Sequence, residues 1–269
     1  MRWCLCFALL ALAWGNWKCP FDVQGQCIIN ASVQADGPLD YNGSVLITNK
    51  AAVRSVGDLS INVEGNVTVD TGSALDAKGK LFITASAVVL VQGSSASAAS
   101  MLQIVAKAAP PSVDRHRPHP ELELSGQVVL DGGSSIGGTT VVLNGTGGVA
   151  LKGGSQVNAQ AIAVGGDCHS GTLLEYSSVE GGRVLLDCNQ SELVITGATN
   201  VTATDDKQIM VFKGKSMDVG SNVTLCAAQI NMVAEETLNT GAILCRSSKT
   251  ASQMTLTTQG AMVLRGLSW

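Results

Sequence analysis

The chain has 269 residues, of which 45% are hydrophobic and only 14% are charged, and glycine alone occupies 30 positions. A disordered chain combines low hydrophobicity with many charges, so this composition indicates a folded protein. The formal net charge of −4 argues against nucleic acid as a partner, because proteins that bind nucleic acid gather lysine and arginine on one surface.

The first residues predict secretion. Arg2 precedes a short apolar run, and Ala13 and Gly15 place small residues in front of a cleavage site after position 15. We therefore expect a signal peptide over 1–15 and an N-terminal cap over 16–40. No later run of about 18 apolar residues occurs, so no transmembrane segment is expected. The predicted location is extracellular or at the cell surface, reached through the secretory pathway.

Seven Asn-X-Ser/Thr sequons support the same compartment, since they are acceptors for N-glycosylation. About two would be expected by chance in a chain of this composition. Turns rich in Asn, Ser and Thr also generate such sequences by accident, which is the alternative explanation. The predicted glycosylation sites are Asn30, Asn42, Asn66, Asn144, Asn189, Asn200 and Asn222.

A repeat organises the chain from about residue 41 onward. Its pattern is V-x-Φ-x-x-G-S-x-Φ-x-A/G, in which Φ is apolar. The four clearest copies begin at Val67, Val88, Val128 and Val149. Their glycines are 21 residues apart, except that 19 additional residues lie between the second copy and the third. A fixed period of this length is typical of a solenoid.

Each repeat contains short alternating segments and one further apolar patch, such as Leu81-Phe82-Ile83 or Ile162-Ala163-Val164. Alternation buries one face of a strand, and the Gly-Ser pair suits a corner with positive φ. One such unit cannot bury its inner face alone, whereas stacked units can. The prediction is an all-β, single-stranded right-handed parallel β-helix over 41–269, with coils of about 21 residues. A β-sandwich is the alternative, and it would need hairpin turns between most strands.

The repeat resembles that of right-handed parallel β-helix proteins, both the pectin-lyase-like group and the filamentous-haemagglutinin-like adhesins of cell surfaces. The resemblance covers roughly residues 40–265 and is one of repeat rather than of a family motif. It implies architecture, together with a tendency toward adhesion, matrix contact or polysaccharide contact. Fold analogy alone does not establish an activity.

Six cysteines remain after removal of the signal peptide, and an oxidising compartment favours disulfides between them. Residues separated by about one coil lie on neighbouring coils at a distance that a disulfide tolerates. The predicted pairs are Cys168–Cys188 and Cys226–Cys245, with Cys19–Cys27 by remainder at the N-terminal cap. Free or differently paired thiols are the alternative.

The insertion at about 107–125 holds His116, His119 and Glu121 within a proline-rich segment. Prolines keep a backbone out of a β-ladder, so we expect a loop that leaves the rod. These three residues are weak candidates for a metal site, because such a site needs convergent ligands and an organised surrounding shell. A solvated surface loop is the simpler interpretation, and no cofactor is expected.

Catalysis would require paired carboxylates or a calcium cluster with a basic proton acceptor. The chain offers an Asp205-Asp206 pair, and Asp167, Asp187 and Arg183 as the best lyase-type set. We therefore expect a structural or adhesive β-solenoid module without catalytic activity, with a polysaccharide lyase or glycoside hydrolase as the alternative. A glycan or a matrix or wall component is the expected partner, and end-to-end self-association is a further expectation.

Overall fold

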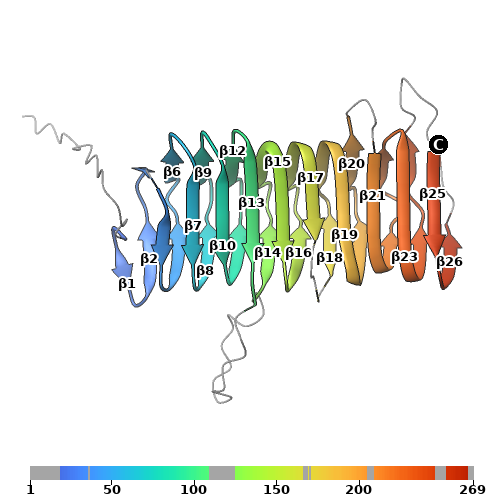
Figure 1. Cartoon of the computed structure of the whole chain (residues 1–269), viewed down its shortest axis with the longest axis horizontal. Coiled ribbons are helices and arrows are strands. Elements are labelled where there is room, and N and C mark those ends of the chain that lie inside the picture. The colour runs from blue at the N-terminus through green and yellow to red at the C-terminus, as the bar shows by residue number, and fades with distance from the viewer. Residues whose placement is uncertain are drawn as a thin grey trace, which may run out of the picture.

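The computed structural model describes residues 19–35, 37–108, 125–165, 169, 171–204, 209–245 and 253–265. Within these residues the chain forms 26 β-strands and no helix. The strands stack as an elongated rod in which successive coils follow one another from the N-terminal to the C-terminal end (Figure 1). The rod has about 9 turns, with coils of about 22 residues, which confirms the predicted parallel β-solenoid.

Three parallel ladders, which we call faces X, Y and Z in the order in which each coil visits them, form the walls of the rod. Face X contains β2 (Gln26–Ile29), β5 (Ser44–Ile47), β8 (Asn66–Val69), β11 (Ala87–Leu90), β14 (Gln127–Leu130), β16 (Gly148–Leu151), β18 (Thr172–Glu175) and, at the C-terminal end, β26 (Ala261–Leu264). The last parts of β19 (Ser178–Thr196), β21 (Ile209–Val219) and β23 (Gln229–Thr240) complete it.

Face Y contains β3 (Val33–Gln34), β6 (Ala52–Ser55), β9 (Ala74–Ala77), β12 (Ser95–Ala98), β20 (Asn200–Ala203), β22 (Thr224–Cys226) and β24 (Ile243–Cys245), and also the first parts of β15 (Ser135–Gly145), β17 (Gln156–Gly165) and β19. Face Z contains β4 (Leu39–Tyr41), β7 (Leu59–Val63), β10 (Leu81–Ala85), β13 (Met101–Ala106) and β25 (Gln253–Thr258), with the remaining parts of β15, β17, β19, β21 and β23 between them.

The ladders reproduce the alignment of the repeat. Val67 pairs in register with Val88, Val88 with Val128, and Val128 with Val149. The coils therefore stack directly across the insertion, and residues 109–124 of that loop lie outside the described part of the chain. At the N-terminal end, β1 (Asp22–Val23) pairs antiparallel with β2, and β2 already pairs in parallel with β5. The parallel ladders thus begin inside the segment 16–40.

The corner between faces X and Y is built by the Gly-Ser pair, as the repeat predicts. Gly72, Gly93, Gly133 and Gly154 all have positive φ, which glycine adopts without steric cost. The following serine turns inward and is buried, and its N–H bonds the carbonyl three residues earlier, as in Ser94 N to Val91 O at 3.1 Å. We call these buried side chains the corner serines: Ser73, Ser94, Ser134 and Ser155, together with Ser177, which occupies the same corner in the next coil and follows Tyr176 rather than a glycine.

One continuous hydrophobic core fills the interior of the rod. Alternate residues of most strands point into it, and Leu81, Ile83 and Leu90 are among the largest side chains that are fully buried. Burying such a side chain contributes roughly 1.5–3 kcal/mol. The late coils differ in composition, because Met210, Phe212 and other large flexible or aromatic side chains replace the branched aliphatic residues of the early coils.

Candidate functional site

A hollow lies on the described surface at the corner between faces Y and Z. It has a volume of about 670 Å³ and crosses four successive coils. Its lining consists of short and polar side chains: Gly138, Thr139, Thr140, Asn158, Ala159, Gln160, Ala161, Gly182, Arg183 and Thr204. We call it the Y–Z hollow.

The hollow forms in the coils in which the fewest residues connect face Y to face Z. In the early coils several residues separate face Y from face Z, such as 56–58 between β6 and β7 or 78–80 between β9 and β10. In the later coils Thr139, Gln160 and Gly182 are single-residue corners, so each strand continues from one face to the next. A side chain at Gly138 would press on the carbonyl of Ala98, with its Cβ at 3.1 Å from the oxygen. Short corners without large side chains thus leave this edge concave.

The chemistry of the hollow is that of hydrogen bonding. Thr139 Oγ1 donates to the carbonyl of Ala99 at 3.0 Å, which fixes the corner to the coil below. Asn158, Gln160 and Arg183 are exposed around it. Amide groups and a guanidinium recognise hydroxyl and carboxylate groups through hydrogen bonds. The lining is therefore suited to binding a polar ligand.

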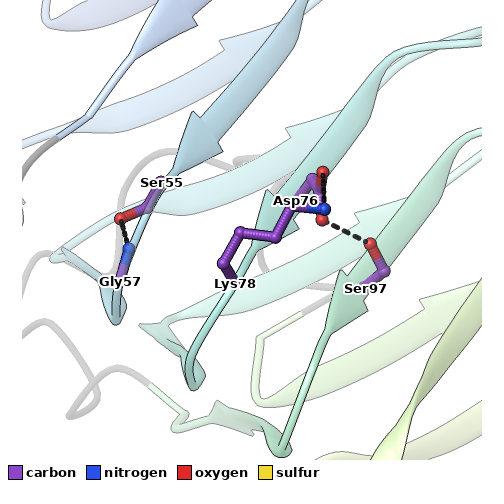
Figure 2. A network of polar contacts seen from close by, with 5 residues as sticks. All are labelled: Ser55, Gly57, Asp76, Lys78 and Ser97. Atoms are coloured by element: carbon purple, nitrogen blue, oxygen red, sulfur yellow. Dashed lines mark hydrogen bonds and ion pairs between the residues drawn. The ribbon is translucent and has the colours of Figure 1, made fainter.

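A second polar cluster lies on the same edge in the early coils. Figure 2 shows Asp76 of β9 between Lys78, whose Nζ is 3.6 Å from its carboxylate, and Ser97 of β12, whose hydroxyl donates to it at 3.1 Å. In the same view the backbone N–H of Gly57 bonds the Ser55 hydroxyl. Lys78 is 69% exposed, so its ion pair contributes at most about 1 kcal/mol. The Ser97–Asp76 hydrogen bond ties two neighbouring coils together, and the other two contacts lie within single coils at the corner.

The candidate lyase-type residues do not converge within the described part of the chain. Arg183 and Asp187 belong to the same strand of face Z, four residues apart, which is about 13 Å along a β-strand. Asp187 instead lies 3.5 Å from Lys213 of the next coil, in an ion pair. Asp167 and the Asp205-Asp206 pair lie outside the described residues.

The candidate metal ligands His116, His119 and Glu121 also lie outside the described residues, so the structure does not test them. Across the part of the chain that is described, no group of three or more His, Cys, Asp or Glu side chains is placed to hold a metal ion. No helix in the same residues is long and apolar enough to cross a membrane.

Two of the predicted disulfides are confirmed. Cys19 and Cys27 are bonded with a Cα–Cα distance of 5.5 Å, and Cys226 and Cys245 with a distance of 4.7 Å. Cys226 and Cys245 are direct partners in the ladder of face Y, as the coil period requires. Cys188 is also disulfide-bonded, and its predicted partner, Cys168, falls outside the described residues.

The sequons lie along two of the three edges of the rod. Asn42, Asn66, Asn144 and Asn189 are at the edge between faces Z and X, Asn30 and Asn222 are at the edge between faces X and Y, and Asn200 opens a strand of face Y. Some hydroxyl groups of the sequons also accept hydrogen bonds from the backbone. Ser44 Oγ accepts from the N–H of Asn66, and Thr146 Oγ1 accepts from the N–H of Ala108.

Two side chains have shifted pKa values. The backbone N–H of Thr71, followed by the hydroxyls of Thr48 and Thr71, donates to Asp70 and lowers the pKa of this carboxyl below its ordinary value. The Thr48 hydroxyl is 3.0 Å from the carboxylate, and Thr71 also bonds Gln92 of the following coil. Burial, together with a hydrogen bond to Asp22, raises the pKa of Tyr41. Both groups tie coils together rather than forming a reactive centre.

Sequence reasoning missed the Y–Z hollow. Its residues are short polar side chains without any reactive pattern. A signal was nevertheless present, because aligning the later copies of the repeat shows that the segment between their second and third apolar patches becomes shorter.

Comparison with protein-family models, with curated proteins and with solved structures gives no match for this chain. The assignment of a parallel β-solenoid therefore comes from the structure alone. Membership in the pectin-lyase-like or filamentous-haemagglutinin-like group stays a prediction.

Proposed function

We propose that this chain is a secreted or cell-surface glycoprotein that acts as a structural and adhesive β-solenoid module, without catalytic activity, and that it binds an extended polar partner along the edge between faces Y and Z. The single observation that carries the proposal is the Y–Z hollow, in which hydrogen-bonding side chains from successive coils line one continuous concavity. A glycan or another matrix or wall component is the class of partner that such groups recognise.

The outward side chains of face Y extend this binding surface along the rod. In the ladder, Ser95 pairs with Ser135, Ser135 with Gln156, and Gln156 with Ser178. Strands of one sheet lie about 4.8 Å apart, so these groups form a straight row with a fixed spacing. A row of weak contacts along a rigid scaffold favours an elongated, repetitive partner, since each further contact forms at high effective concentration.

A binding experiment with matched variants tests the proposal. The full-length secreted protein is applied to arrays of extracellular polysaccharides and matrix proteins, and compared with the Asn158→Ala/Gln160→Ala double variant. The control is Arg54→Ala, which changes an exposed side chain of β6 on face Y, two coils before β12. We expect binding that falls at least about tenfold in the double variant, the equivalent of 1.4 kcal/mol or more, and is unchanged in the control.

The same arrays test the enzymatic alternative. Release of unsaturated or reducing sugar ends from a bound polysaccharide would overturn the assignment of a binding module. Binding that is equal in the wild type and in the double variant would place the adhesive surface elsewhere. Sedimentation velocity at several concentrations tests the separate expectation of end-to-end association.

A further inference from the structure

Face X carries a column of apolar side chains on its outer surface. The column runs along eight successive coils and contains only one hydroxyl residue. Its members are Ile28, Leu46, Thr68, Val89, Val129, Ala150, Leu173 and Val194, each of them half-buried. We call it the X column. In the next coils the same position is occupied by Asp218 and Asn239, so the apolar surface ends there.

The X column is accessible rather than covered by neighbouring side chains. Ala150, Leu173 and Val194 form the floor of a shallow hollow of about 270 Å³. Gly148 and Gly171 lie beside them, and both have positive φ, with backbone of the adjacent coil directly against the position of a Cβ. Because no side chain fits at these two glycines, the apolar floor is open at these two positions, and Gln127, Lys152 and Glu192 also line the hollow. A continuous exposed apolar strip marks a surface at which another group binds.

The sequons flank this column on both sides. Asn42, Asn66, Asn144 and Asn189 follow one edge of face X, and Asn30 and Asn222 follow the other. None of the seven sequons lies at the edge between faces Y and Z, where the Y–Z hollow is. The potential glycans are thus concentrated at the two edges of face X, on either side of the X column.

We propose that N-glycans attached at the two edges of face X lie over the X column and keep this face from associating with other rods. Sugar rings present C–H groups on their faces and hydroxyls around their rims, so they cover an apolar strip while presenting a wet surface to solvent. Glycans on both edges also hinder the close approach of a second flat face. The proposal rests on the secretory part of the proposed function and leaves the Y–Z hollow free for the partner.

Removal of the edge glycans from the secreted protein tests the proposal. The variant Asn66→Gln/Asn144→Gln/Asn189→Gln loses acceptors at one edge of face X, and Asn200→Gln, on face Y, is the matched control. Glycan occupancy is mapped by mass spectrometry, and the association state is followed by sedimentation and by binding of an apolar fluorescent dye. We expect the triple variant to associate and to bind several times more dye, while the control stays like the wild type.

A second set of variants identifies the surface. Val89→Thr/Val129→Thr/Val194→Thr makes the X column polar while keeping β-branched side chains that suit a strand. Added to the triple glycan variant, these changes should restore the wild-type association state. Association that persists would show that another surface is responsible, and would overturn the proposal.

The remaining outcomes separate this proposal from the proposed function. Occupied sequons whose removal changes neither association nor dye binding would overturn the shielding role alone. Unoccupied sequons on the secreted protein would overturn both the shielding role and the glycoprotein assignment. Loss of array binding in the Asn158→Ala/Gln160→Ala variant concerns only the Y–Z hollow and is independent of either result.

Discussion

The early coils, up to β13, and the late coils, from β15 onward, solve the same folding problem in different ways. The early coils use separate strands of two to six residues joined at marked corners. In the late coils the strands merge, so that β19 alone follows all three faces over 19 residues. From residue 199 onward the corner serines are replaced by Thr199, Val223 and Ala242, which are also buried. A solenoid thus tolerates large changes in its corners as long as its inward columns remain apolar.

The merging of strands follows from the length of the corner. A corner of one residue keeps the backbone N–H and C=O groups in register with the coil below, whereas a corner of three residues interrupts the ladder. Ser178–Thr196 can therefore be one strand, while Ala74–Ala77 and Leu81–Ala85 are two. The late coils thereby gain continuous pairing and the concave Y–Z edge, and the early coils gain marked turns with repeated Gly-Ser geometry.

The largest expected effect comes from the core of the late coils. Phe212 is fully buried, so Phe212→Ala should reduce the free energy of unfolding by about 3–5 kcal/mol. Ile83→Val, at the corresponding inward column of an early coil, should cost only about 1 kcal/mol. Urea denaturation followed by circular dichroism measures both. A loss below about 1 kcal/mol for Phe212→Ala would contradict a tightly packed late core.

The disulfide of the late coils gives the next effect. The Cys226–Cys245 bond closes a loop with a sequence separation of 19 residues, and its removal by Cys226→Ser/Cys245→Ser should cost about 3 kcal/mol. Because a solenoid coil contacts only its neighbours, protection from hydrogen exchange should fall in β22 and β24 and stay unchanged in β9 and β10. Uniform loss of protection along the rod would show that all coils unfold as one unit.

The Gly-Ser corner should show a smaller cost. Gly93 has φ +74° and no atom within 4 Å of a would-be Cβ, so Gly93→Ala strains only the backbone, by about 1–2 kcal/mol. Gly137 has ordinary φ, with its nearest contact at 3.6 Å, and Gly137→Ala should change stability by less than about 0.5 kcal/mol. Equal midpoints in thermal unfolding for the two variants would argue against the conformational origin of the effect.

The buried hydroxyls of the two regions should respond in opposite ways. Among the described residues, Ser94 Oγ is buried and has no hydrogen-bond partner, whereas Thr199 Oγ1 donates to Thr196 O at 2.6 Å. Ser94→Ala removes an unsatisfied polar atom and should leave stability unchanged or raise it by up to about 1 kcal/mol. Thr199→Val removes a hydrogen bond and should lower stability by about 1 kcal/mol. Denaturant titration of both variants measures the difference, and a destabilised Ser94→Ala would point to a bound partner for that hydroxyl.

The smallest effect concerns pH. The folded-state pKa of Asp70 is below its ordinary value of 3.8, so the ionised carboxylate contributes stability above that pH. This contribution is lost as the pH falls through the folded pKa. Asp70→Asn should therefore destabilise the early coils slightly at neutral pH. The melting temperature of this variant should also fall less steeply as the pH is lowered into the acid range. If the melting temperatures of wild type and variant fall equally steeply with pH, Asp70 does not contribute to the acid sensitivity of the protein.

The repeat allowed much of the fold to be predicted. The alignment of Val67, Val88, Val128 and Val149 gave the true ladder register, because residues one coil apart must stack when one face is buried. The same period predicted the Cys226–Cys245 bond. The hollow was not predictable in this way. It is lined by the single-residue corners Thr139, Gln160 and Gly182, which lie side by side only because three coils stack.

The sequence by itself determined the coil: the apolar period, the Gly-Ser corners and the spacing of the cysteines are local patterns, and each coil repeats the contacts of the one before it. Only the tertiary structure decided what the outside of the rod presents. Whether an outward side chain joins the X column, the Y–Z hollow or an edge that carries sequons depends on which face its strand joins. Small differences in corner length decide where the edge between faces Y and Z becomes concave, and outward positions lack the burial constraint that makes the inward pattern readable.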